Sequence, residues 1–146
     1  MVLWRISGHR DLSGTGGLRA GGRWHSPGQP VVYLSENPAS VLLEVCVHAA
    51  ANDVPPEFTL LKVIGPEVEI PAVAEASLPE GWQTRFEITR HLGTDWLQSK
   101  ETVLLKLPSA IVPQTANFLF NPLHRDAVRF KIAEVLSYPF DRRIKQ

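Results

Sequence analysis

The hydrophobic positions of the chain form short runs that prolines and glycines separate, and most of these runs have the length of a β-strand. Predicted strands lie at residues 2–7, 31–35, 58–64, 102–108 and 109–113. Residues 68–70 are expected to extend or pair with the third of these strands. Residues 116–122 form a further apolar segment, and residues 127–141 fit either a strand or a helix.

Two segments have a helical pattern. The first, residues 37–53, begins with Asn37 as a natural N-cap and Pro38 at the first helical position. Its apolar side chains cover almost the whole helix circumference, which predicts a buried helix. The second, residues 79–97, is expected to form one or two short helices anchored by tryptophans. This mixture predicts an α+β fold, a compact single domain over residues 1–146 with a mixed or antiparallel central sheet and flanking helices.

Composition narrows the classes of function. The chain has 15 basic and 15 acidic residues, so a net charge of zero argues against direct binding to DNA. The single Cys46 excludes an internal disulfide and is expected to be a core residue. The N-terminal residues do not have the pattern of a signal peptide, so we expect none. No run approaches the roughly 20 apolar residues of a membrane helix, and the histidines show no metal-ligand spacing. We therefore expect a cytoplasmic protein that binds no metal and no membrane.

Arg23 is the first candidate for chemistry because it follows Gly21 and Gly22 in a loop rich in glycine. Such glycines permit a positive φ and let a ligand approach the backbone, and a guanidinium matches phosphate with two hydrogen bonds. Composition alone also fits a flexible surface loop with a solvated arginine.

Tyr33 shares one face of the strand at 31–35 with Val31 and Ser35, while Val32 and Leu34 share the other. If the Val32 face packs on the core, the Tyr33 face can line a cleft and stack on a flat heterocycle. The alternative is an ordinary core tyrosine with a satisfied hydroxyl.

Glu44 and His48 occupy the one polar sector of the predicted buried helix, four residues apart. A buried carboxylate needs a partner or a function, because unpaired burial is costly. The alternative is a Glu–His pair at a solvent-facing edge.

Polar residues also interrupt the apolar segments near the C-terminal half. Ser109 follows a Leu-Pro break, without the glycine-flanked turn of a serine nucleophile. Asn117 and Asn121 bracket "FLF" and are expected either to orient a ligand or to cap turns.

These residues occur in blocks that closely resemble the RES domain family, named for its Arg, Glu and Ser. The blocks are "GGRWHSPGQPVVYLSENPASVLLEV", "LPSAIVP" and "NFLFNP". The resemblance extends from "LWRISGHRDLSGTGGLRAGGRW" to "YPFDRR", nearly the whole chain. Arg23, Tyr33, Glu44 and Ser109 match the residues of the family pattern.

The resemblance implies an NAD-consuming toxin of a bacterial toxin–antitoxin pair, with a fold similar to ADP-ribosyltransferases. It also implies a hetero-oligomer with an Xre-type helix-turn-helix antitoxin that blocks the site and makes any DNA contact. NAD is then the substrate. Catalytic roles fall to Glu44, Arg23, Tyr33 and Ser109, and NAD contacts to Arg23, Tyr33, Gly22, Asn117 and Arg5, with Arg5 as a second phosphate contact.

The sequence is consistent with three hypotheses about the activity. NAD cleavage with water or phosphate as acceptor depletes cellular NAD and arrests growth. Transfer of ADP-ribose to a specific host protein uses the same site. A module that only binds the antitoxin, without catalysis, belongs to another class.

Overall fold

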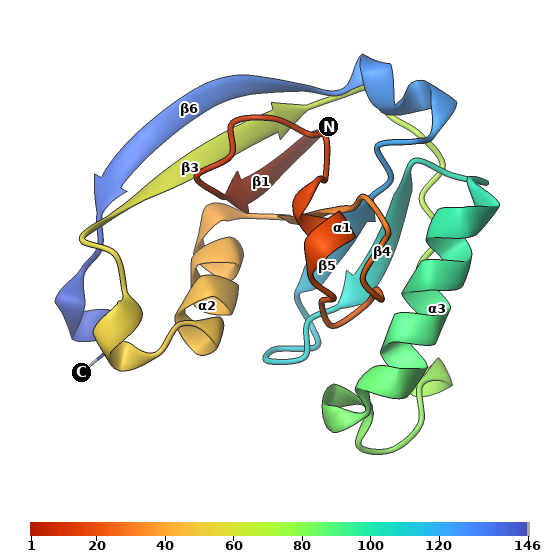
Figure 1. Ribbon diagram of the computed structural model, residues 1–146, viewed down its shortest axis with the longest axis horizontal. Helices are drawn as coiled ribbons and strands as arrows, with labels where there is room; N and C mark the ends of the chain where they lie inside the picture. Colours follow the sequence, from red (N-terminus) through yellow and green to blue (C-terminus); the bar gives the residue numbers. More distant parts are fainter. Residues whose placement is uncertain (146) are drawn as a thin grey trace.

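The computed structural model describes residues 1–145, and its centre is one six-stranded sheet (Figure 1). The strands are β1 (Val2–Ile6), β2 (Val32–Ser35), β3 (Glu57–Ile64), β4 (Leu104–Pro108), β5 (Ala116–Phe120) and β6 (Lys131–Pro139). Their order is β4-β5-β2-β1-β3-β6, and every neighbouring pair is antiparallel. The predicted α+β class with an antiparallel sheet is confirmed.

The sheet is joined weakly at its centre. β1 pairs with β2 through a single register position, Trp4 opposite Ser35, whereas β1 pairs with β3 over five positions, from Val2 opposite Ile64 to Ile6 opposite Leu60. The sheet therefore consists of two halves, β4-β5-β2 and β1-β3-β6, that meet near Ser35. β1 and β2 are free to diverge beyond that residue.

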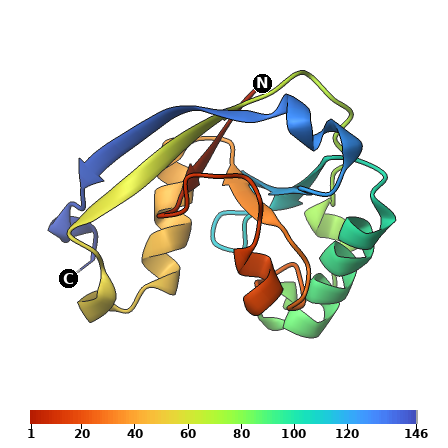
Figure 2. The same cartoon turned by 45° about the horizontal axis from the view of Figure 1, so that its top comes forward.

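Three α-helices lie around the sheet: α1 (Gly16–Arg19), α2 (Pro38–His48) and α3 (Phe86–Ser99). Figures 1 and 2 show α2 beneath the β1-β3-β6 half and α3 beside β4. Asn37 caps α2 as predicted, since its side chain accepts a hydrogen bond from the Ser40 backbone N–H at 2.9 Å. Short 3₁₀ turns lie at Ala51–Asp53, Glu75–Ser77, Trp82–Thr84, Arg125–Arg129 and Arg142–Ile144.

Two apolar clusters form the core, and alternation along the strands separates them. One contains Val32, Leu34 and Phe118, together with Phe130, whose ring meets Phe120 edge-on. The other lies between the sheet and α3 and consists of Trp24, Val31, Trp82, Leu97, Leu105, Leu107 and Leu119. Tyr33 packs against this second cluster, so the predicted division of the two faces of β2 is confirmed.

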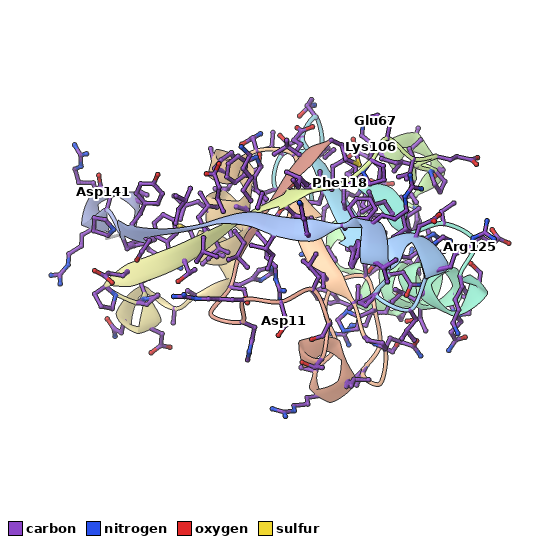
Figure 3. All side chains as sticks on the ribbon, turned by 90° about the horizontal axis from the view of Figure 1, so that it is seen from above. Asp11, Glu67, Lys106, Phe118, Arg125 and Asp141 are labelled. Carbon is purple, nitrogen blue, oxygen red and sulfur yellow. The ribbon has the colours of Figure 1, made fainter. Side chains whose placement is uncertain are left out.

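The C-terminal segment closes the edge of the sheet. Seen from above in Figure 3, β6 crosses the molecule from the end near Arg125 to the end near Asp141. After it the chain returns to α2, where the Lys145 ammonium donates to the backbone carbonyls of Cys46 and Ala49. A cation at these last carbonyls stabilises the C-terminal end of the helix.

Several predicted elements differ from the structure. Residues 109–113 form no strand, because they make the turn between β4 and β5. Residues 68–70 pack Val68 and Ile70 on the core without joining the sheet, and only Ala72 bridges to Lys106. The ambiguous segment at 127–141 contains the end of a 3₁₀ turn followed by β6, and the glycine-rich loop contains the short helix α1.

The expectation that α2 is a buried helix is wrong. Val41 and Cys46 are buried, but Leu43 is 39% exposed and Val47 is 55% exposed. The apolar residues therefore cover more of the circumference than the sheet can bury. Cys46 is a core residue, as predicted.

Within residues 1–145, no helix has the length and apolar character needed to cross a membrane. In the same part of the chain, no three His, Cys, Asp or Glu side chains are grouped so that they can hold a metal ion.

Candidate active site

A cavity of about 820 Å³ opens where β1 and β2 separate. Its wall combines Arg5 of β1, Tyr33 and Ser35 of β2, Asn117 of β5 and Glu44 of α2. The segment between α1 and β2 and the first turns of α3 complete it with residues Gly21, Gly22, Arg23, Trp24, His25, Phe86 and Arg90. Its volume lies within the range of small-molecule sites, roughly 300–1,000 Å³.

Two hydrogen bonds hold the Glu44 carboxylate in this wall. Oε1 accepts one from the Ser109 hydroxyl at 2.8 Å and one from the Asn117 amide nitrogen at 2.7 Å. Oε2 accepts none from the described part of the chain. One carboxylate oxygen is thus anchored while the other is available to a ligand.

Ser109 is fully engaged. Its hydroxyl donates to Glu44 and accepts from the backbone N–H groups of Ile111 and Val112, at 3.1 and 3.3 Å. A hydroxyl has one donor and two acceptor positions, so all are used. Ser109 is 3% exposed and is not part of the cavity lining, so it acts on the site through Glu44.

Two arginines flank the exposed ring of Phe86. The Arg23 guanidinium carbon lies 5.0 Å from the ring centroid and that of Arg90 lies 5.4 Å from it, both within cation–π range. Arg23 also donates from Nη1 to the Gln83 carbonyl, and Arg90 donates from Nε to the Gly22 carbonyl at 2.7 Å. Each guanidinium has five N–H donors, so both retain donors for an anion in the cavity.

Tyr33 is fixed by its hydroxyl. His25 Nε2 lies 2.9 Å from the Ala20 carbonyl, so Nε2 carries the proton and Nδ1 is the acceptor. The Tyr33 hydroxyl therefore donates to Nδ1 at 2.7 Å and accepts from the Trp24 N–H at 3.1 Å. Burial raises the pKa of Tyr33 to about 12 and lowers the pKa of His25. The Tyr33 hydroxyl therefore stays protonated near neutral pH.

The glycines before Arg23 differ from the prediction in their backbone conformation. Gly21 and Gly22 do not adopt a positive φ, in contrast to Gly14 at +68°. A Cβ on Gly22 would lie 2.5 Å from the Tyr33 hydroxyl and 3.0 Å from the His25 ring. Gly22 is small because Tyr33 and His25 occupy the space of a side chain.

The segment around Arg23 is attached to α3, so it is not a free loop. Thr89 donates from its hydroxyl to the Arg23 carbonyl at 2.5 Å, and Thr94 accepts from the Ser26 N–H at 3.0 Å. Arg5 approaches from the opposite half of the sheet, where its Nη1 donates to the Asp11 carbonyl at 3.0 Å. Burial lowers the pKa of Arg5.

The family model described as "RES domain" matches residues 2–141. This chain belongs to the RES domain family. The predicted resemblance is therefore confirmed.

Named relatives of this RES domain are toxins. The chain is 47% identical over 137 residues to "Toxin Res" of Pseudomonas putida, a match that covers 90% of this chain and 92% of that protein. It is 36% identical to "Prs ADP-ribosylating toxin" of Sphingobium sp., over 97% of this chain and 95% of that protein. It is 31% identical to "Toxin Res" of Photorhabdus laumondii, over 99% and 97%.

A solved structure shares the fold of this RES domain. It is the M. tuberculosis MbcT–MbcA toxin–antitoxin complex, whose matching chain aligns with a TM-score of 0.75 at 17% identity. The alignment covers 98% of this chain and 85% of that chain.

The RES domain brings the sequence-predicted residues together. Arg5, Gly22, Arg23, Tyr33, Glu44 and Asn117 line the cavity, and Ser109 contacts Glu44 from outside the lining. Asn121 lies elsewhere: its amide donates to the Leu97 carbonyl at the end of α3. The alternative prediction for Glu44 was a pair with His48. Glu44 instead bonds to Ser109 and Asn117, and His48 lines the cavity.

Three polar residues of the site were not among the predicted ones. His25, Arg90 and Ser35 all line the cavity. Ser35 had a signal, because it shares the strand face of Tyr33. His25 and Arg90 had none, since their contacts depend on how α3 docks on the segment before β2.

Proposed function

We propose that this RES domain is the toxin of a toxin–antitoxin pair and that it breaks the bond between nicotinamide and ribose in NAD. The main support for this reaction is the geometry of the Glu44 carboxylate. Ser109 and Asn117 hold its Oε1 in the wall of a cavity that arginines also line. The name of the Sphingobium relative, an ADP-ribosylating toxin, supports NAD as substrate, because ADP-ribosylation takes its ADP-ribose from NAD.

Glu44 acts on the reacting ribose. Cleavage of an N-glycosidic bond passes through an oxocarbenium-like transition state, as in glycoside hydrolysis. The free Oε2 of Glu44 holds the ribose hydroxyls and stabilises the positive charge that develops on the sugar. Nicotinamide leaves readily, so the reaction requires neither a second carboxylate as acid nor a metal ion.

The other residues bind and orient NAD. Arg23 binds the pyrophosphate with its remaining donors, beside Gly22, and Arg5 adds a second phosphate contact from β1. Tyr33, whose hydroxyl is occupied by His25 and Trp24, offers its ring for stacking on nicotinamide. Asn117 and Ser109 orient the substrate through their bonds to Glu44.

The first test is nicotinamide release from NAD by the purified protein. We expect Glu44→Gln to lower kcat by about 10²–10³, the usual effect of removing an electrostatic stabiliser of the transition state. Arg23→Ala should raise KM. The matched controls are Glu80→Gln and Arg10→Ala, exposed residues outside the cavity lining. Full activity in Glu44→Gln, or no release under any acceptor condition, contradicts the proposal.

The name of the Sphingobium relative favours a second candidate, transfer of ADP-ribose to a specific host protein. Product masses with and without phosphate, together with a search for labelled protein in a lysate, separate this transferase from a glycohydrolase or phosphorylase. A labelled protein band that depends on Glu44 identifies the transferase.

The partner is a cognate antitoxin of the Xre helix-turn-helix type. It inserts a segment into the cavity and blocks entry of NAD, and it makes any contact with DNA because the toxin is electrically neutral. The solved complex with a shared fold supports an antitoxin partner. We place this hetero-oligomer in the cytoplasm, with residues 1–146 forming one toxin domain.

A purely structural antitoxin-binding module is the competing class. Expression without the antitoxin distinguishes the two, because an enzyme arrests growth and lowers cellular NAD, and Glu44→Gln abolishes both effects. Hosts that tolerate the wild-type protein without loss of NAD favour the module.

A further inference from the structure

Ser35 is a buried serine at the joint between the two halves of the sheet. It is the position of β2 that pairs with both neighbours, with Trp4 of β1 and with Asn117 of β5. It is 3% exposed, and its hydroxyl lies 2.7 Å from Asn117 Oδ1. The backbone of Ser35 is therefore held on both sides, which fixes the position from which its side chain extends.

The chemistry of the neighbours determines the direction of this hydrogen bond. A carboxylate only accepts, so the Asn117 group 2.7 Å from Glu44 Oε1 must be the amide nitrogen. The amide oxygen then faces Ser35, and the Ser35 hydroxyl must donate to it. The chain Ser35 → Asn117 → Glu44 has one consistent direction and ends on the anchored oxygen of the carboxylate.

We propose that Ser35 is a positioning residue for the reaction, one that fixes the Asn117 amide so that Glu44 is held with Oε2 toward the ribose. This inference rests on the proposed function. Without the Ser35 hydroxyl, the oxygen of the Asn117 side-chain amide has no donor, and the amide is free to rotate. Rotation then places this oxygen against the Glu44 carboxylate, where the two repel each other. Glu44 then keeps Ser109 as its only fixed partner and is no longer held in one orientation.

The kinetic signature follows from where Glu44 acts. An interaction realised mainly in the transition state affects kcat, whereas uniform binding affects KM. We expect Ser35→Ala to lower kcat by about tenfold, equivalent to about 1.4 kcal/mol of transition-state stabilisation, with little change in KM for NAD. Ser35→Thr, which retains a hydroxyl on a strand position, should restore most of the loss.

The matched control is Ser137→Ala. Ser137 is also a strand serine, but it lies exposed on β6, outside the cavity lining. We expect it to retain wild-type kcat and KM. Circular dichroism and the urea midpoint of each variant separate a loss of folded protein from a loss of turnover.

A second measurement does not depend on turnover. In the ligand-free protein labelled with ¹⁵N, the side-chain amide of Asn117 is identified by its disappearance in Asn117→Ser. Its protons should exchange with water more slowly than those of the exposed Asn52 amide, and Ser35→Ala should remove that protection.

The outcomes are separable. Unchanged amide protection in Ser35→Ala overturns the inference, as does unchanged kcat when protection is lost. If the wild-type protein cleaves no NAD, the proposed function fails and the catalytic part of the inference fails with it. The amide exchange then still decides whether Ser35 orients Asn117.

Discussion

At the scale of single residues, the site depends on how closely its polar groups are packed. The Tyr33 hydroxyl occupies the space beside the Gly22 α-carbon and is bonded to both His25 and the Trp24 backbone. This places the aromatic ring of Tyr33 in the cavity wall with no freedom to turn away. The absence of a side chain at Gly22 is thus a condition for the position of Tyr33.

Gly22→Ala should therefore damage the site through Tyr33. The added methyl group must displace the hydroxyl or the His25 ring, because it would lie 2.5 and 3.0 Å from them. We expect a loss of about 1–3 kcal/mol in the free energy of unfolding and a rise in KM for NAD. Urea unfolding and nicotinamide release measure the two effects.

Gly8→Ala is the control for this substitution. A Cβ at Gly8 would meet no atom of residues 1–145 within 4 Å, and the φ of Gly8 is not positive. Its stability and activity should match those of the wild-type protein. Wild-type behaviour of Gly22→Ala as well would show that Tyr33 has room to move.

At the scale of elements, α3 is the support on which the arginine segment is built. Thr89 and Arg90 of α3 bond to the carbonyls of Arg23 and Gly22, and Gly93 lies against the Trp24 backbone. The helix and the segment approach each other closely at Gly93. A change there moves Arg23 without touching it.

Gly93→Ala tests this support. Alanine normally stabilises a helix interior relative to glycine by about 1 kcal/mol. Here its Cβ would overlap the Trp24 carbonyl oxygen, so we expect a net loss of about 1–3 kcal/mol in the free energy of unfolding, with a raised KM for NAD. Urea denaturation and steady-state kinetics provide the measurements. Gln98→Ala, at an exposed position of α3, should change neither, and increased stability of Gly93→Ala would refute the close contact.

Local signals predicted the elements that local interactions stabilise. Asn37 and Pro38 located the start of α2 because capping acts within one helical turn. The failures came from partners distant in sequence. The apolar content of residues 109–113 resembled a strand, but β4 and β5 already pair with each other and leave these residues as their turn. The exposure of Leu43 and Val47 likewise depends on which face of α2 meets the sheet.

At the scale of the whole molecule, the site lies where the two halves of the sheet meet. Arg23, Tyr33 and Glu44 were predictable as a group, because consecutive segments bring them to one cavity. Ser109 and Asn117 were predicted as site residues, the first because it matches the family serine and the second because it interrupts an apolar segment. Their hydrogen bonds to Glu44 were not predicted. The contact of Ser35 with Asn117, and the places of His25 and Arg90 in the site, required the tertiary structure. No short-range pattern reports a contact between β2 and β5 or between α3 and the segment before β2.

His25 couples this site to the stability of the whole protein. Its imidazole is neutral in the folded state, because Nε2 donates to Ala20 and Nδ1 accepts from Tyr33. Burial lowers the pKa of His25 below the ordinary value of 6.5, and the charge of Arg90 acts in the same direction. As pH falls below about 6.5, the unfolded state therefore takes up a proton that the folded state does not.

Stability should consequently fall with decreasing pH, from about 6.5 down to the lowered pKa of the folded state, by at most about 1.4 kcal/mol per pH unit from this residue. Urea unfolding of the wild-type protein and of His25→Asn should be measured from about pH 7.5 to about pH 5. The difference between the two free energies of unfolding gives the contribution of His25. Asparagine offers an acceptor near the position of Nδ1 and does not titrate, so the variant should lose less stability over this range. Other titrating groups contribute equally to both proteins and cancel in the difference. Parallel pH curves would mean that His25 is protonated as readily in the folded state as in the unfolded chain, and that the Tyr33 hydroxyl does not donate to it.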